Sequence, residues 1–330
     1  WSGGKDRFNQ SVLVRTPAMT HETISATVDA VVAHHDGLRQ RLTRHAHGVW
    51  SLEIAEQASV PVRRVETGGL DEQALRDLVA TESEAATERL DPDAGIMLSA
   101  VWFDAGAGEQ GRLLLVAHHL VVDGVSWQVL LEDLAMAAVA TANGETPALD
   151  PVVTPLRAYS RIVTLQAQES ARIAELERWT AVTAPGAELV PAASGHAVVG
   201  SGARRTFTVD AATTAAVLTA VPAMVNADVT DVLLAALRLS VTEWFTSKRR
   251  RGDLLVDLER HGREELAAGV DLSRTVGWFT SVAPVRLTDG DEAVDVLKNV
   301  KERLRGAPDG GIGYGIDRLT MLLTDSASIR

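Results

Sequence analysis

A stretch rich in proline, glycine and small residues divides the chain into two parts. Residues 182–203 contain Pro185, Pro191 and several glycines but almost no charged side chains. Such a composition is typical of a linker or a domain boundary. At roughly 150 residues per domain, a chain of 330 residues also has the length for about two domains. We therefore expect an N-terminal lobe over residues 1–182, a linker over 183–203 and a C-terminal lobe over 204–330.

Strand patterns and helical patterns are mixed in both lobes. In the N-terminal lobe we expect strands near residues 10–14, 49–54, 61–65, 97–103 and 113–117, and helices near 20–35, 71–87 and 125–141. In the C-terminal lobe we expect strands near 205–209, 254–258 and 283–287, and helices near 211–218, 230–246 and 291–305. The order lacks the strict alternation of strand and helix that gives a parallel sheet, so it predicts an α+β fold with mixed sheets.

The composition excludes several classes of chemistry. The chain has no cysteine, so disulfides, thiolate metal sites and cysteine nucleophiles are impossible. Its formal net charge of −12 argues against nucleic-acid and membrane-surface partners, which need a concentrated basic face. No apolar run reaches the roughly 18 residues of a membrane span, and no secretory signal opens the chain. Without either segment we expect a cytoplasmic protein. No cluster of His, Asp and Glu has good metal-ligand spacing, so we also expect no metal site.

The sharpest local feature is a pair of histidines, His118 and His119, at the end of an apolar strand pattern. Neighbouring strand residues point to opposite faces, so one histidine can face a cleft while the other supports the backbone. Histidine titrates near neutrality, which suits proton transfer. Asp123, at the turn into the next helix, could orient the imidazole or anchor the loop. The alternative is a strand end with two hydrogen-bonded core histidines.

A second candidate follows the strand expected near residues 254–258. Glu259 stands at its C-terminal end, before the charged turn of residues 260–264. Buried among apolar neighbours, this carboxyl group would have a raised pKa and could act as a base. The alternative is a salt-bridged surface turn in which Arg260 and Arg263 neutralise the nearby carboxylates.

Two further segments lack an obvious reacting group. Residues 274–285 have Arg274 as their one ionisable side chain and carry aromatic residues, which is typical of a loop that positions a substrate. Residues 310–315 are rich in glycine, which allows a close approach of backbone or ligand. This run follows a helix and Pro308 rather than a strand, so it does not indicate a dinucleotide site.

Taken in order, these motifs resemble the condensation-domain superfamily of nonribosomal peptide synthetases, which is related in fold to chloramphenicol acetyltransferase. The HHxxxDG signature stands at residues 118–124. Within the superfamily the flanking details are similar to the epimerization branch. The matching segments are Ser126-Trp127, the D-x-L-L-x-A segment at 231–236, the EGHGRE motif at 259–264, the RTVGWFTSxxPV motif at 274–285 and the P-x-x-G-x-G-Y-G motif at 308–315. Residues 8–11 and 35–39 also match that branch.

The resemblance implies a two-lobed, V-shaped pseudo-dimer in which each lobe is a mixed sheet with helices. The active site would lie in a tunnel between the lobes, with His119 and Glu259 as its acid/base pair. The supporting residues would be His118, Asp123, Gly124, Ser126 and Trp127. The tunnel residues would be Arg274, Gly277, Trp278, Phe279, Thr280, Ser281 and Tyr314.

The implied reaction is L-to-D epimerization at Cα of an aminoacyl or peptidyl thioester. The substrate would hang on the 4'-phosphopantetheine arm of a peptidyl carrier protein, the expected partner beside neighbouring synthetase domains. The domain would need no cofactor of its own.

The sequence departs from the branch in two places. Arg260 replaces the glycine of EGHGRE, and the chain ends about a hundred residues earlier than such domains usually do, so we expect a truncated C-terminal lobe. Two other functions stay open: condensation with amide-bond formation, and a non-catalytic domain that recruits a carrier or another partner.

Overall fold

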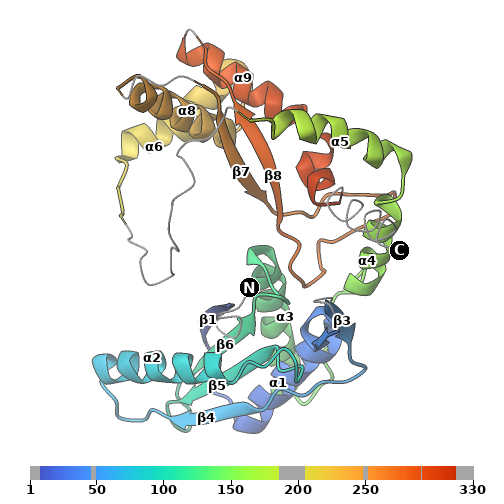
Figure 1. Ribbon diagram of the computed structural model, residues 1–330. Coiled ribbons are helices and arrows are strands. Elements are labelled where there is room, and N and C mark those ends of the chain that lie inside the picture. The colour runs from blue at the N-terminus through green and yellow to red at the C-terminus, as the bar shows by residue number, and fades with distance from the viewer. Residues whose placement is uncertain (1–7, 46–49, 186–204, 248–251, 291, 317–330) are drawn as a thin grey trace. The chain divides into compact units, whose positions relative to one another are not determined.

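The computed structural model describes the chain except for residues 1–7, 46–49, 186–204, 248–251, 291 and 317–330 (Figure 1). The chain divides into two compact units. The first unit consists of Trp1–Val163 with Glu265–Thr280, and the second of Thr164–Glu264 with Ser281–Arg330. The units differ from the lobes expected from the sequence in two places. Residues 164–182 belong to the second unit and not to the first, and residues 265–280 belong to the first unit and not to the second. Most of the expected linker lies outside the described residues.

The first unit is built on a four-stranded mixed sheet with the strand order β1-β6-β5-β4. Its strands are β1 (Asn9–Arg15), β4 (Val62–Glu66), β5 (Leu98–Asp104) and β6 (Arg112–His118). β6 pairs antiparallel with both β1 and β5, whereas β4 pairs parallel with β5. A separate antiparallel hairpin joins β2 (Gln40–Arg44) to β3 (Trp50–Ile54), after the short 3-10 helix η2 (Asp36–Arg39).

Alternating residues of the central strands face two apolar cores. Leu113, Leu115 and Ala117 of β6 pack with α1 (His21–His34) and α3 (Gly124–Ala142) on one face of the sheet. Leu114 and Val116 pack with α2 (Glu72–Glu88) on the other face (Figure 1). The two faces together bury almost the whole of β6, so the residues that follow it enter the structure in a fixed orientation.

The helices of the first unit begin where side chains cap them. Thr20 accepts a hydrogen bond from the N–H of Thr23 before α1, and Asp71 caps α2 in the same way. α3 is long and apolar enough by composition to be a candidate membrane span. Its buried side chains, however, belong to the core shared with α1 and the sheet, which is the ordinary place for such a helix.

The second unit contains an antiparallel pair of strands, β7 (Leu254–Arg260) and β8 (Ser281–Leu287). Its helices are α5 (Ser170–Val182), α6 (Ala211–Leu218), α7 (Ala220–Val225), α8 (Val229–Ser247) and α9 (Ala293–Arg305), followed by the 3-10 turn η5 (Pro308–Gly311). α4 (Leu156–Gln166) runs across the boundary between the units. An apolar core joins α8, α9 and the two strands.

One expected strand is wrong, and two helices were not predicted. Residues 205–210 form no strand, and Phe207 is 86% exposed, so the apolar alternation there pairs with no strand among the described residues. The helices α4 and α5 were not predicted. The buried residues of these two helices are Tyr159 in α4 and Arg172 and Trp179 in α5, so few of their side chains meet a core.

Candidate functional site

β6 delivers the two histidines to different surroundings. His118 ends the strand, is 3% exposed, and lies on the sheet face of Leu114 and Val116. Its Nδ1 accepts a hydrogen bond from the N–H of Leu120 at 3.2 Å, which supports the turn after the strand. His119 is half-buried in the turn that follows the strand, where it lies beside Phe8 and Gln10.

The imidazole of His119 is held by a hydrogen bond and by aromatic rings. Its Nε2 lies 2.8 Å from the side-chain nitrogen of Gln10 on β1. The Phe8 ring stacks on it at 4.5 Å with an interplanar angle of 8°, and the Trp278 ring lies at 4.9 Å. The Nδ1 atom of His119 is buried and has no hydrogen-bond partner in the described part of the chain.

Gln10 and Phe8 are site residues that sequence reasoning did not single out. Their position follows from the antiparallel register, in which Asn9 pairs with His118 and the N–H of His119 donates to the carbonyl of Phe8 at 2.8 Å. The signal available in the sequence was the match of residues 8–11 to the epimerization branch. Without the strand pairing, that match assigned them no role.

Asp123 anchors the turn that follows the histidines. It is 2% exposed and caps α3, with Oδ1 accepting from the N–H of Ser126 at 2.7 Å. Its Oδ2 accepts from the N–H of Phe279 at 3.1 Å. These bonds agree with the loop-anchoring alternative for Asp123. Gly124 starts α3 with nothing within 4 Å of where a Cβ would stand.

Ser126 and Trp127 make separate connections from the first turn of α3. The Ser126 hydroxyl lies 2.9 Å from the carbonyl oxygen of Gly277 and accepts from the N–H of Gly277 at 3.1 Å. The Trp127 indole N–H donates to the side-chain oxygen of Gln10 at 2.8 Å. Ser126 therefore holds the segment 265–280, and Trp127 holds Gln10, which contacts His119.

Arg274 fixes the same returning segment through ion pairs with one buried and one exposed carboxylate. Its guanidinium pairs with Asp133, which is 0% exposed, and with Glu132 at 2.9 Å. Asp133 also bonds Nε2 of His35 at 2.7 Å, and burial lowers the pKa of His35 below its ordinary value. Gly37 is required here because a Cβ would come within 2.2 Å of the Val276 carbonyl oxygen.

His34, His35 and Asp133 are close enough in space to be considered as metal ligands. Two observations argue against that use. Arg274 already neutralises Asp133, and Nε2 of His34 donates to the carbonyl oxygen of Asp150 at 2.8 Å. We therefore interpret this cluster as a contact that holds the segment of Arg274 in place and not as a cation site. Its residues lie far apart in the sequence, so no spacing rule indicated them.

The remaining residues of the 274–285 motif have different environments. Phe279 is 6% exposed and packs against Tyr159 at 5.2 Å, whereas Trp278 is 41% exposed. Thr280 is half-buried at the end of the returning segment. Ser281 begins β8 in the second unit and pairs with Arg260. Gly277 has no room for a side chain, since a Cβ would lie 2.8 Å from the Phe279 ring.

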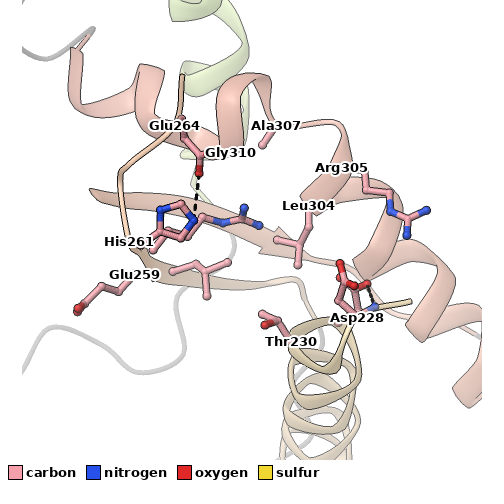
Figure 2. A pocket seen from close by; sticks show the side chains of 12 residues that line it. Asp228, Thr230, Glu259, His261, Glu264, Leu304, Arg305, Ala307 and Gly310 are labelled. Carbon is pink, nitrogen blue, oxygen red and sulfur yellow. Dashed lines mark hydrogen bonds and ion pairs between the residues drawn. The ribbon is translucent and has the colours of Figure 1, made fainter. Parts of the chain in front are cut away.

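Glu259 lies in the second unit, near the end of β7, and lines a cavity of about 590 Å³ (Figure 2). The other lining residues are Asp228, Thr230, Asp231, Leu258, Arg260, His261, Glu264, Leu304, Arg305, Ala307 and Gly310. In Figure 2 the Glu259 carboxylate points away from Asp228 and Arg305.

The expected burial of Glu259 is wrong. Its side chain is exposed, because alternation places it opposite the strand face whose members, Leu254, Val256 and Leu258, meet the core. The alternative of a salt-bridged turn also does not hold for this residue, since no ion pair to Glu259 occurs among the described residues. His261 is the residue that faces Glu264, at 3.7 Å.

The glycine-rich segment near the C-terminus is shaped by packing on α5. Arg172 of α5 pairs with Asp309, whose φ is +43°, and a Cβ at Gly313 would lie 2.1 Å from Glu175 Oε2. Tyr314 packs edge-on against Trp179 at 5.5 Å. Gly313 thus allows this segment to approach α5 closely. The tunnel role expected for Tyr314 is not tested by these contacts.

Comparison with known proteins identifies the family. The sequence model described as "Condensation domain" matches residues 2–323. A linear gramicidin synthase subunit of Brevibacillus parabrevis is 35% identical over 327 residues, which cover 94% of this chain and 6% of that protein. A plipastatin synthase subunit of Bacillus subtilis is 32% identical over 332 residues, covering 94% of this chain and 9% of that protein. The chain thus spans less than a tenth of either relative.

Solved structures match the fold over most of the chain. The epimerization domain from the third module of tyrocidine synthetase B has a TM-score of 0.79 at 24% identity, covering 95% of this chain and 72% of that one. The X-domain from teicoplanin biosynthesis has a TM-score of 0.73 at 22% identity, covering 92% and 66%. The predicted fold class, an α+β domain of the condensation superfamily, is confirmed. The chain belongs to the condensation-domain family.

Proposed function

We propose that this domain epimerizes the Cα of an aminoacyl or peptidyl residue held as a thioester on the phosphopantetheine arm of a peptidyl carrier protein. The context would be a nonribosomal peptide synthetase of the kind that makes linear gramicidin or plipastatin, since the similar sequences lie in those synthases. The carrier protein and the neighbouring synthetase domains would be the partners, in the cytoplasm. No cofactor of the domain's own is needed for this reaction.

The reaction requires a proton to leave Cα and a proton to return from the opposite face. Such chemistry needs ionisable groups that reach the substrate, together with stabilisation of the enolate formed between the two steps. We assign these tasks to His119 and Glu259, with His118, Asp123, Ser126 and Trp127 holding the first of them in place.

One observation carries this choice over other activities of the family. A carboxylate, Glu259, lines a cavity at the end of β7 and has no ion-pair partner among the described residues. Amide-bond formation by His119 would leave that carboxylate without a task, whereas epimerization uses it. The Ser126-Trp127 extension, which ties α3 to Gly277 and Gln10, supports the same branch.

The test is solvent exchange at the tethered residue. A carrier protein loaded with an L-aminoacyl thioester is incubated with the domain in deuterated water, and the released amino acid is examined by mass spectrometry. We expect deuterium at Cα with the wild-type domain, and a loss of at least about a hundredfold in rate with H119A or E259Q. Glu243→Gln, at an exposed position on α8, is the matched control and should keep the wild-type rate.

Condensation is the second candidate, and the description of the matching family model favours it. Adding a second carrier protein loaded with an acceptor amino acid separates the two activities. Peptide formation without deuterium uptake would mean condensation. Neither product, with carrier binding retained, would mean a non-catalytic recruitment domain. Unchanged exchange in both H119A and E259Q would overturn the residue assignment even if epimerization occurred.

A further inference from the structure

Gln10 connects Trp127 to His119 through its side-chain amide. The Trp127 indole nitrogen lies 2.8 Å from the Gln10 oxygen, and the Gln10 nitrogen lies 2.8 Å from Nε2 of His119. The three residues come from α3, from β1 and from the end of β6, and all belong to the first unit. The chain of bonds is therefore a property of this unit alone.

The direction of every bond in this chain is determined by chemistry. An indole N–H can only donate, so the Gln10 group that faces Trp127 must be the oxygen. The amide NH₂ then faces His119, where it can only donate, so Nε2 of His119 must accept. A neutral imidazole that accepts at Nε2 carries its proton on Nδ1. Free histidine prefers the other tautomer.

The remaining surroundings of His119 leave Nδ1 as its available donor. Phe8 stacks on the ring face, and Trp278 lies against it at a tilt of 53°. Nδ1 is buried without a hydrogen-bond partner in the described residues. An unmet buried donor is costly, which favours a ligand that satisfies it. Trp278 is 41% exposed, so a substrate can displace this ring without opening a core.

We propose that Gln10, oriented by Trp127, is a positioning residue that holds His119 as the neutral Nδ1–H tautomer, so that His119 meets the substrate as a hydrogen-bond donor and not as a base. This inference rests on the proposed function for the identity of the acceptor, which is the thioester carbonyl oxygen. A neutral imidazole can polarise a carbonyl and stabilise the enolate that forms beside it.

If His119 acts as a donor, the Cα proton of the substrate must pass to another group, and we assign this task to Glu259. The Cα–H bond breaks, its proton passes to the Glu259 carboxylate, and the electron pair moves into the carbonyl to give the enolate held by His119 Nδ1–H. Water protonates the opposite face of Cα, and the hydroxide left behind takes the proton from Glu259. Every group returns to its starting state, with one solvent hydrogen placed at Cα.

The test reads the tautomer directly. ¹⁵N nuclear magnetic resonance of the histidine-labelled 330-residue chain distinguishes a protonated from an unprotonated ring nitrogen, and H119Q identifies the His119 signals among the nine histidines. At a pH where the ring is neutral we expect Nδ1–H in the wild type. Gln10→Glu offers only acceptors, so it should switch His119 to the Nε2–H tautomer. Gln128→Glu, an exposed neighbour of Trp127, is the control and should leave Nδ1–H in place.

The outcomes separate this inference from the proposed function. Nε2–H in the folded wild type, or no change in Q10E, would overturn the inference whatever the activity. A second variant, Q10L, keeps it testable if Q10E unfolds, because His119 should then relax to the tautomer of free histidine. If the tautomers behave as expected, Q10E should lose about tenfold in exchange rate. Expected tautomers with no exchange in the wild type would instead refute the proposed function.

Discussion

The hydroxyl of Ser126 contacts both the carbonyl oxygen and the N–H of Gly277, 151 positions away in the sequence. Together with the bond from Phe279 N–H to Asp123, this contact joins the two strongest motifs of the chain. The turn after the two histidines is therefore bonded, through Asp123 and Ser126, to Gly277 and Phe279. We call these bonds the Ser126–Gly277 contact.

Replacing Ser126 by alanine removes a buried hydroxyl that accepts from the N–H of Gly277 and lies within hydrogen-bond distance of the Gly277 carbonyl oxygen and of Asp123 Oδ1. We expect the free energy of unfolding of the first unit to fall by about 1–3 kcal/mol, because buried polar groups lose their partners. Urea titration followed by tryptophan fluorescence measures the change. The control Ser59→Ala removes only an exposed hydrogen bond to Asp29 of 3.3 Å and should leave the stability nearly unchanged. Equal losses of unfolding free energy in the two variants would contradict a stabilising role of the Ser126–Gly277 contact.

Arg274→Gln should be more damaging than S126A. It leaves the fully buried Asp133 without its guanidinium partner, and breaking a buried ion pair in this way typically costs about 3–5 kcal/mol. The same variant should raise the pKa of His35, because the positive charge of Arg274 is one cause of its low value. A pKa of His35 that is unchanged in a folded R274Q protein would contradict this network.

The stability of the first unit should depend on pH through His35. Burial lowers the pKa of His35 in the folded chain below 6.5, against the favourable contact with Asp133. The unfolded chain therefore binds more protons below about pH 6.5, and the stability contributed by neutral His35 is lost as the pH falls through that window. Urea titrations across this range should show a smaller pH dependence in H35Q than in the wild type. Identical slopes would show that His35 does not carry the effect.

Gly313→Ala and Gly315→Ala make a matched pair in the second unit. A Cβ at Gly313 would stand 2.1 Å from Glu175 Oε2, whereas nothing lies within 4 Å of one at Gly315. We expect G313A to push the Glu175 carboxylate away from its partner Arg172 and so to destabilise the unit by about 1 kcal/mol. Residues 312–316 are helical, so G315A should be neutral or stabilising by up to about 1 kcal/mol, since alanine favours a helix. Equal thermal shifts in the two variants would contradict the packing account of this motif.

The sequence predicted the local parts of the site and missed the parts made by distant residues. The strand that ends at His118 and the turn at Asp123 were predicted because both depend on neighbouring residues. The role of Gln10 depends on the pairing of β1 with β6, and the network of His35, Asp133 and Arg274 joins three distant segments. No local pattern encodes such contacts.

The error about Glu259 has a related cause. A run of apolar residues suggested burial on both sides of the strand, but β7 meets the core on one face only. The division of the chain was also not readable from composition. Residues 265–280 return to the first unit because Asp123, Ser126 and Asp133 hold them there, and these partners lie over a hundred positions earlier in the chain.

Exchange at Cα in both directions tests the central claim most directly. The wild-type domain is incubated in deuterated water with carrier protein loaded either with the L-aminoacyl or with the D-aminoacyl thioester, and the released amino acids are separated by chirality and weighed. We expect both reactions to reach the same mixture of epimers, with deuterium at Cα in each. Retention of the starting configuration and of the Cα hydrogen, in both reactions and with carrier binding intact, would contradict it.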